Sequence, residues 1–176
     1  MEVYVLRIGH RYVRDERTST HLFLVARAFG AHGVIYTGQR DKKIEDEVVK
    51  IDEDWGGTLK VEYAESWERI IKKWREGGGE VIHLTMYGLP IQDVIGQIRK
   101  SEKDKLIIVG GAKVPGPVYK MAVWNVAVTN QPHSEVSALS VFLHELFEGR
   151  ELTKNFKDAK MIIMPQPKGK KVIKGS

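Results

Sequence analysis

Residues 123–149 read VWNVAVTNQPHSEVSALSVFLHELFEG, and they contain the signals of a strand, a loop and a helix in direct succession. Residues 123–129 are a short run rich in β-branched side chains, which is typical of a buried strand. Polar residues follow as a loop. Pro132 and Gly149 are placed as at the first turn and just past the end of a helix. A strand that leads directly into a helix is the repeating unit of α/β proteins.

The helix predicted after Pro132 has one broad apolar stripe. Its members recur at the three- and four-residue spacing of one helix face. They are Val136, Leu139, Phe142, Leu143, Leu146 and Phe147. Such a stripe belongs either to the core alone or to the core and a dimer face together, and the sequence leaves both alternatives open.

The same alternation of strand and helix extends back to the N-terminus. Strands are predicted at residues 3–8, 34–37, 58–63, 81–85, 106–109 and 123–129, with 161–164 as a last edge strand. Helices are predicted at residues 19–29, 41–54, 66–76 and 90–100. Thr18 or Ser19 is expected to cap the first of these helices. This order predicts an α/β fold with a mainly parallel sheet and helices on both of its faces.

The length of 176 residues suits one domain. We expect residues 1–164 to form that domain and residues 165–176 to form a basic tail with Lys168, Lys170, Lys171 and Lys174. The N-terminus alternates apolar and charged residues, unlike a signal peptide. No apolar run approaches the roughly 20 residues that span a bilayer. We therefore expect a cytoplasmic protein without a membrane partner.

Several classes of chemistry are excluded by what the sequence lacks. There is no cysteine, which rules out disulfides, thiolate nucleophiles and cysteine-bound zinc. Neither the GxxxxGKS/T of a P-loop nor a GxGxxG after a strand occurs. The six histidines include none at the spacing of the HExxH zinc motif, so no metal site is expected.

Three loops follow predicted strands at the ends where open α/β sheets bind ligands. They are residues 86–90 (MYGLP), 110–117 (GGAKVPGP) and 130–135 (NQPHSE). Paired glycines let the backbone approach a ligand closely, prolines fix the path of the chain, and a helix N-terminus has unpaired N–H groups. The sequence therefore predicts a ligand site built from these loops.

Three motifs resemble a known family. Residues 130–149 (NQPHSEVSALSVFLHELFEG), 110–115 (GGAKVP) and 14–21 (RDERTSTH) are similar to the archaeal tRNA (cytidine(56)-2'-O)-methyltransferases, which belong to the SPOUT class. The resemblance extends over nearly the whole chain. It implies that a homodimer transfers a methyl group from S-adenosylmethionine to the ribose 2'-hydroxyl of cytidine 56 in the T-loop of tRNA, without a metal.

The resemblance also implies a deep C-terminal trefoil knot, in which the chain after residues 106–109 threads through a loop formed earlier. General topology rules would have argued against such threading. In this family the donor lies among the knotted loops and the substrate site is at the subunit junction. The residues that the resemblance assigns to the donor are Leu84, Gly110, Gly111, Ala112, Lys113, Val114, Val128, Thr129, Asn130, Gln131, Pro132, His133, Ser134 and Glu135.

One position departs from the wider class of knotted ribose methyltransferases. In that class an arginine on the first helix, at a fixed distance before a glycine, activates the ribose hydroxyl. Counted back from Gly30, this position is Leu24 here. We expect Arg17 to take the catalytic role and Arg14 to hold a phosphate. Arg27 faces away from the apolar stripe of its helix, so a surface or interface role fits it better.

Two other functions fit the residues when the resemblance is set aside. A non-catalytic module that binds a nucleotide or RNA would use the same glycine loops and basic ends. Among enzymes, a knotted methyltransferase that modifies a base instead of the ribose is the other alternative.

Overall fold

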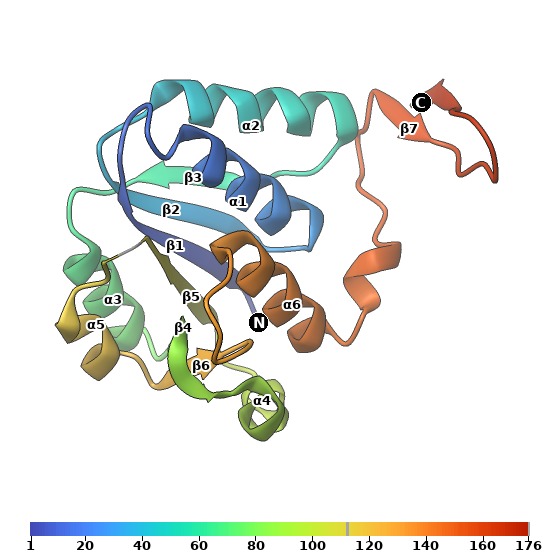
Figure 1. Cartoon of the computed structure of the whole chain (residues 1–176). Coiled ribbons are helices and arrows are strands. Elements are labelled where there is room, and N and C mark those ends of the chain that lie inside the picture. Colours follow the sequence, from blue (N-terminus) through green and yellow to red (C-terminus); the bar gives the residue numbers. More distant parts are fainter. Residues whose placement is uncertain (112, 176) are drawn as a thin grey trace.

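The main body is a six-stranded parallel sheet in the order β3-β2-β1-β5-β4-β6 (Figure 1). The computed structural model describes residues 1–111 and 113–175. The strands are β1 (Val3–His10), β2 (Gly33–Gly38), β3 (Lys60–Tyr63), β4 (Glu80–Pro90), β5 (Lys105–Gly110) and β6 (Trp124–Ala127). The mainly parallel α/β sheet expected from the sequence is confirmed, whereas the threading of a knot stays a prediction.

Helices cover both faces of this sheet. They are α1 (Glu16–Ala28), α2 (Lys42–Trp55), α3 (Trp67–Glu76), α4 (Ile91–Lys100), α5 (Gly116–Met121) and α6 (Glu135–Phe147), followed by the 3-10 turn η1 (Arg150–Thr153). Val3 and Val5 of β1 pack into the core under α1, α2, α4 and α6, while Leu6 and Ile8 pack under α3 and α5. This alternation follows from the two-residue period of a strand.

The apolar stripe of α6 forms part of the core. Leu139, Phe142 and Leu143 have no exposed surface, and Leu146 is 3% exposed. The remaining two members, Val136 and Phe147, are partly buried against the same core. The stripe therefore forms core, as both alternatives required, and whether Val136 and Phe147 also contact a second subunit stays a prediction.

Helix α1 begins earlier than the sequence suggested. Its N-cap residue is Asp15, and no side chain caps it by a hydrogen bond. Thr18 and Ser19 lie inside the helix, so the prediction that one of them is the cap was wrong. The backbone N–H of Ser19 donates to the carbonyl of Asp15 at 2.8 Å, which already closes a helical turn.

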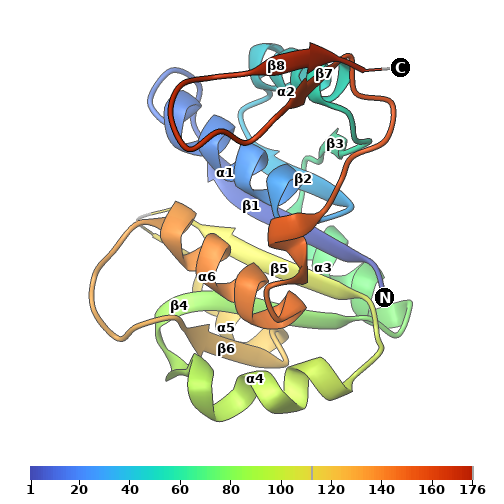
Figure 2. The same cartoon turned by 90° about the vertical axis from the view of Figure 1, so that its right-hand side faces the viewer.

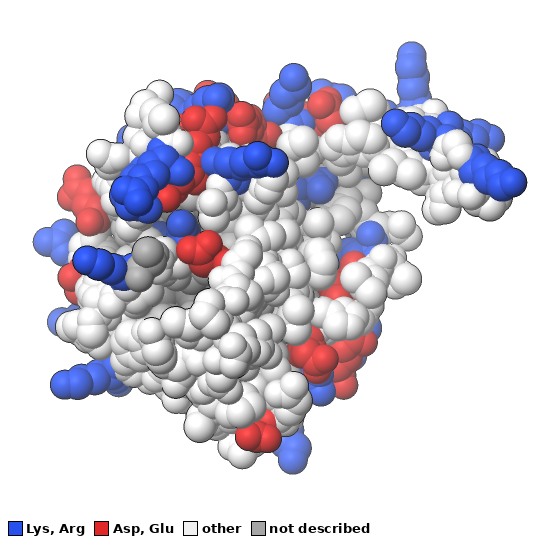
Figure 3. All heavy atoms as spheres, viewed as in Figure 1, with Lys and Arg blue, Asp and Glu red and all other residues white. Residues whose placement is uncertain are grey.

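The C-terminal strand does not join the main sheet, so the prediction of an edge strand there was wrong. Strand β7 (Met161–Ile163) pairs antiparallel with β8 (Val172–Lys174) instead. Together they form a hairpin that projects from the body beyond the end of α2 (Figures 1 and 2). The hairpin carries a cluster of Lys side chains, drawn in blue at the upper right of Figure 3.

The hairpin is reached through residues 154–160, which we call the strap. The strap crosses from the side of α6 to the side of α2 (Figure 2). Its Phe156 ring lies 4.7 Å from the Arg27 guanidinium, whose Nε donates to Asp52 Oδ1 at 2.6 Å. Of the surface or interface role expected for Arg27, the surface role was therefore wrong: its side chain is buried because the strap and α2 cover it.

Candidate functional site

A cavity of about 340 Å³ opens at the carboxyl ends of β4 and β5 and before α6. This volume lies within the range of small-molecule sites. The three predicted loops meet here and contribute Met86, Tyr87, Gly110, Gly111, Val114, Pro132, His133, Ser134 and Glu135. Leu84 and Val128, which the resemblance also assigned to the donor, line the cavity beside them. The walls also include five residues that were not expected at the site: His83, Thr85, Val109, Tyr119 and Ala138.

Some residues expected at the donor site do not line this cavity. Lys113, Thr129 and Gln131 are exposed beside it, and Ala112 lies outside the described residues. Asn130 has a different task, since its Nδ2 donates to the carbonyls of Met86 at 2.7 Å and Gly88 at 3.1 Å. It thereby ties the loop before α6 to the end of β4.

An irregularity in β4 shapes one wall of the cavity. Leu84 and Leu89 both lie opposite Val126 of β6, so residues 85–88 arch away from the sheet. Gly88 permits the close approach, because a Cβ there would lie 2.5 Å from the carbonyl carbon of Asn125. The sequence predicted a strand that ends at Thr85, which is where the pairing between β4 and β6 is interrupted.

His83 is held in one neutral tautomer at the floor of the cavity. The Asn125 Nδ2 donates to the Tyr119 carbonyl at 2.8 Å, so its Oδ1 faces His83 Nδ1 at 2.9 Å as an acceptor. The Nδ1 atom must then carry the proton. Burial lowers the pKa of the imidazole, which the hydrogen bond to Asn125 offsets in part. The ring is therefore neutral at physiological pH.

Arg7 of β1 is a buried cation behind the same cavity. Its side chain is 2% exposed, and its Nη1 lies 3.6 Å from Glu135 Oε1 at the start of α6. Among the described residues, Nε and Nη1 of Arg7 have no hydrogen-bond acceptor. An arginine inside the otherwise apolar strand VYVLRIGH is the signal by which the sequence could have indicated this residue.

The segment before α1 is fixed by a two-point ion pair. Arg11 donates to Asp15 from Nε at 2.8 Å and from Nη2 at 3.0 Å. These bonds hold the pKa of the Asp15 carboxyl below its ordinary value. Behind this turn, His10 contacts Ser19 Oγ at 2.8 Å through Nδ1 and Asp41 Oδ2 at 3.2 Å through Nε2. The first turns of α1 are thus anchored to β1 and α2.

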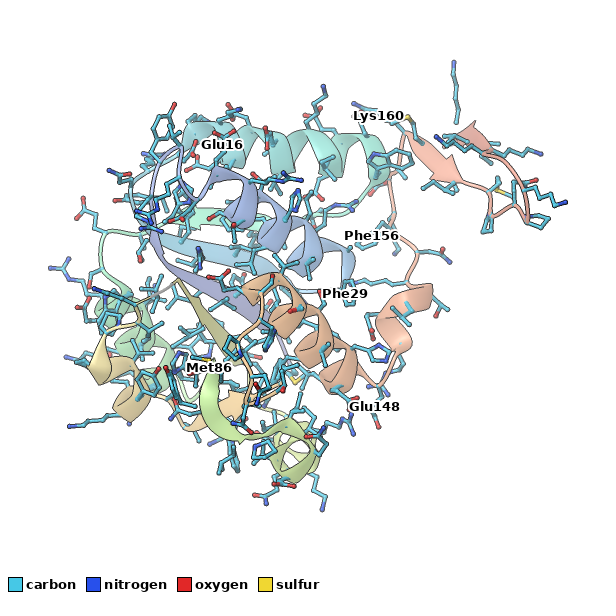
Figure 4. The ribbon with its side chains drawn as sticks, viewed as in Figure 1. Glu16, Phe29, Met86, Glu148, Phe156 and Lys160 are labelled. Carbon is cyan, nitrogen blue, oxygen red and sulfur yellow. The ribbon has the colours of Figure 1, made fainter. Side chains whose placement is uncertain are left out.

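The two arginines expected to act on the substrate do not line the donor cavity. Arg14 is exposed, and Arg17 lines a shallow hollow with Val13, His21 and Glu47. Figure 4 labels Glu16, the neighbour of Arg17, and Met86 of the cavity wall, and the two lie well apart along the same edge of the molecule. Within one chain, the structure does not bring these arginines to the donor loops.

Comparison with known proteins shows to which family the chain belongs. The family model for the tRNA ribose 2'-O-methyltransferase aTrm56 matches residues 55–173. A tRNA (cytidine(56)-2'-O)-methyltransferase of Methanothermobacter thermautotrophicus is 54% identical over 170 residues, covering 97% of this chain and 95% of the relative. The corresponding protein of Thermococcus kodakarensis is 49% identical over 174 residues, and the alignment covers 97% of this chain and 96% of that relative. The chain belongs to the aTrm56 family.

Solved structures with lower sequence similarity share the fold of this aTrm56 member. The TrmH/SpoU tRNA modifying enzyme of A. aeolicus aligns with a TM-score of 0.63 at 13% identity, over 86% of this chain and 76% of that one. The SpoU methyltransferase AviRb of Streptomyces viridochromogenes, solved with AdoMet, has a TM-score of 0.62 at 15% identity. This alignment covers 85% of this chain and 58% of that one. The SPOUT-type fold implied by the resemblance is thus confirmed.

Two further structural findings concern this aTrm56 member. Among residues 1–111 and 113–175, no helix has both the length and the apolar character needed to cross a bilayer. The same residues contain no group of three or more His, Cys, Asp or Glu side chains placed to hold a metal ion.

Proposed function

We propose that this chain methylates the ribose 2'-hydroxyl of cytidine 56 in tRNA with S-adenosylmethionine as the donor. The observation that carries the proposal is the convergence of three loops on one cavity in a member of the aTrm56 family. The body built on the six-stranded sheet forms the catalytic domain, and the lysine-rich residues 165–176, which include strand β8 of the projecting hairpin, contact RNA. The reaction takes place in the cytoplasm, where the tRNA substrate is available.

The cavity suits the donor in size and chemistry. Leu84, Val109, Val114 and Val128 offer apolar walls for the adenosine, and the backbone of Gly110 and Gly111 lies at the surface of the cavity. Glu135 supplies a carboxylate for the charged end of the ligand. When bound, the donor supplies a methyl group on a positively charged sulfur.

The chain has to supply alignment and charge for the ribose oxygen. A ribose hydroxyl is a weak acid, so a cation that stabilises the developing negative charge lowers the barrier. An arginine can do this and can bind a neighbouring phosphate at the same time. We assign the first task to Arg17 and the second to Arg14, both exposed at the start of α1.

The active unit is a homodimer in which Arg17 of one subunit acts at the donor cavity of the other. The separation of α1 from the cavity within one chain supports this arrangement. A broad surface without charged side chains, which extends over α6 in Figure 3, supplies a candidate interface. Because most of the apolar stripe lies in the core, we place the interface on the outer side of α6, where Val141 is 40% exposed.

A methyl-transfer assay tests the proposal directly. Unmodified tRNA is incubated with donor carrying a tritiated methyl group, and the product is digested with nuclease and analysed by mass. We expect label on the ribose of cytidine 56, and none on a transcript with a 2'-deoxycytidine at that position. Donor binding by calorimetry without any transfer would instead indicate a non-catalytic binding module.

A further inference from the structure

A second cavity, of about 520 Å³, lies between the strap and the main sheet, and we call it the strap cavity. Its walls include His32, directly before β2, and Lys60, the first residue of β3, together with residues 154–158 of the strap. The donor cavity lies at the other end of the parallel strands, after β4 and β5. Figure 4 labels Phe156 and Lys160 on the strap that forms one wall. The proposed methyl transfer makes no use of this second cavity.

Three lysines without an ionic partner line the strap cavity. Lys60 comes from β3, and Lys154 and Lys157 come from the strap. Within residues 1–111 and 113–175, none of these ammonium groups pairs with a carboxylate. Cations of one sign gathered around a hollow raise the local concentration of anions. The charge of the strap cavity therefore favours an anionic ligand.

The acidic residues nearby do not cancel this charge. Arg27 also lines the strap cavity, but its Nε donates to Asp52 Oδ1 at 2.6 Å, so these two charges neutralise each other. Glu2 precedes β1, and the two-residue period of that strand places its side chain on the face of Tyr4, with which it lines a different cavity. Asp158 is left as one carboxylate against three lysines.

His32 adds a donor with a defined direction. Its Nδ1 accepts from the backbone N–H of Val3 at 3.1 Å. The neutral ring must then carry its proton on Nε2, on the other side of the imidazole. The described residues offer this N–H no acceptor, so it is available to an oxygen of a ligand. Flexible ammonium groups and one fixed N–H together suit a phosphate, which has charge and several acceptor oxygens.

We propose that the strap cavity binds a backbone phosphate of the tRNA substrate, at a site separate from the donor cavity. This inference rests on the proposed function and extends the RNA contact beyond residues 165–176 to the start of β2 and β3. Residues 154–174, which comprise the strap and most of the hairpin, contain seven lysines and one acidic residue. The strap cavity thus continues the positive charge of the hairpin, and a continuous basic path of this kind suits a polyanion.

A double substitution tests the phosphate contact. Lys60→Gln combined with Lys154→Gln should fold normally, because both side chains are exposed. Fluorescence anisotropy with labelled, unmodified tRNA should show about 3- to 30-fold weaker binding, as for the loss of two exposed ion pairs. The slope of the logarithm of affinity against the logarithm of salt concentration should become shallower by about 1 for each lysine that contacts a phosphate.

The matched control removes two exposed lysines from the other face of the sheet, Lys73 on α3 and Lys120 on α5. Lys73→Gln combined with Lys120→Gln changes the net charge by the same amount. It should bind tRNA like the wild type, because charges more than a Debye length of about 8–10 Å from a phosphate are screened. An equal loss in both double variants would show an effect of net charge alone and would overturn the inference.

The absence of cysteine from the chain allows the RNA to be located directly. Lys154→Cys and, as the control, Lys120→Cys each receive one photoactivatable aryl azide on the new sulfur and are irradiated with tRNA. We expect crosslinked RNA from position 154 and none from position 120. No crosslink from position 154, or wild-type affinity and salt slope in the Lys60 and Lys154 double variant, would contradict the strap cavity as an RNA site. A wild type that binds no tRNA would instead refute the proposed function.

Discussion

At the scale of single residues, the catalytic role proposed for Arg17 can be tested by substitution. Arg17→Ala should lower the single-turnover rate at saturating tRNA by about 10²- to 10³-fold, the effect of losing one donor to a developing oxyanion. Donor affinity should stay within about twofold, since the proposed contact of Arg17 is to the ribose oxygen in the transition state and not to the donor. Arg14→Ala, as the comparison, should raise the KM for tRNA. A rate for Arg17→Ala close to wild type would move the role to Arg14.

Gly111 allows a test of the donor loop that leaves the fold intact. A Cβ at this position meets nothing closer than the Arg7 guanidinium at 3.9 Å, so Gly111→Val should fold normally. The added side chain occupies space where backbone must approach the ligand. Calorimetry should show loss of S-adenosylmethionine binding with an unchanged melting temperature. Normal affinity would remove residues 110–114 from the donor site.

The buried His83 should make the protein sensitive to acid. Its pKa in the folded state is lowered from 6.5 by burial, so below pH 6.5 the unfolded chain takes up a proton that the folded chain resists. Stability is then lost as the pH falls from 6.5 toward the folded pKa. Urea titrations between pH 7 and pH 5 should show a smaller loss for His83→Gln than for the wild type. Equal losses would contradict this role.

The residues of the cavity could be predicted only in part. Gly110, Gly111 and the loop before α6 carry local signals of glycine and proline, which the sequence displays directly. Arg7 and His83 come from the interiors of strands, and their part in the cavity depends on which strands are neighbours. Strand order is a property of the whole chain, so no local pattern reveals it.

At the scale of secondary structure, the β7–β8 hairpin is the element most suited to RNA. Replacing Lys168, Lys170, Lys171 and Lys174 with Gln should raise the KM for tRNA and flatten its salt dependence. The slope of the logarithm of tRNA affinity against the logarithm of salt concentration should become shallower by about 0.7 to 0.9 for each phosphate that the hairpin no longer neutralises. Turnover at saturating tRNA should hardly change. A salt slope equal to that of the wild type would show that the hairpin does not touch the RNA.

Helices and strands whose apolar residues recur with a clear period were predictable from the sequence. Elements whose position depends on tertiary contacts were not. The strand at residues 161–164 was recognised, but its partner Val172–Lys174 was interpreted as part of a tail because a short basic segment carries little periodicity. Helix α5 was missed since it has six residues and follows a proline. The start of α1 was misplaced because Asp15 ends a turn that its pairing with Arg11 stabilises.

At the scale of the whole molecule, subunit association should be sensitive to the outer face of α6. Val141→Glu would bury an unpaired charge in the proposed interface, at a cost of several kcal/mol. Sedimentation at micromolar concentration should show a dimer for the wild type and a monomer for this variant. Val49→Glu, the same change on the exposed side of α2, should remain dimeric. A monomeric wild type would contradict the interface.

Mixed dimers test whether Arg17 acts across that interface. Arg17→Ala and Gly111→Val are each expected to be inactive, for different reasons. If the two residues of one site come from different subunits, a hybrid dimer has one site with both defects and one intact site. Unfolding and refolding the two variants together should therefore recover activity. No recovery would place both residues of a site in the same chain.

The strap has a consequence for synthesis of the chain on the ribosome. Phe156 covers Arg27, and the Lys157 carbonyl accepts from the backbone N–H of Gly57 at 3.3 Å, so late residues complete the packing of early helices. Roughly 130 residues separate Arg27 from Phe156, and translation at about 5–20 residues per second needs on the order of ten seconds for them. During that interval α1 and α2 emerge without this cover, so their apolar and charged surfaces under the strap are open to chaperones.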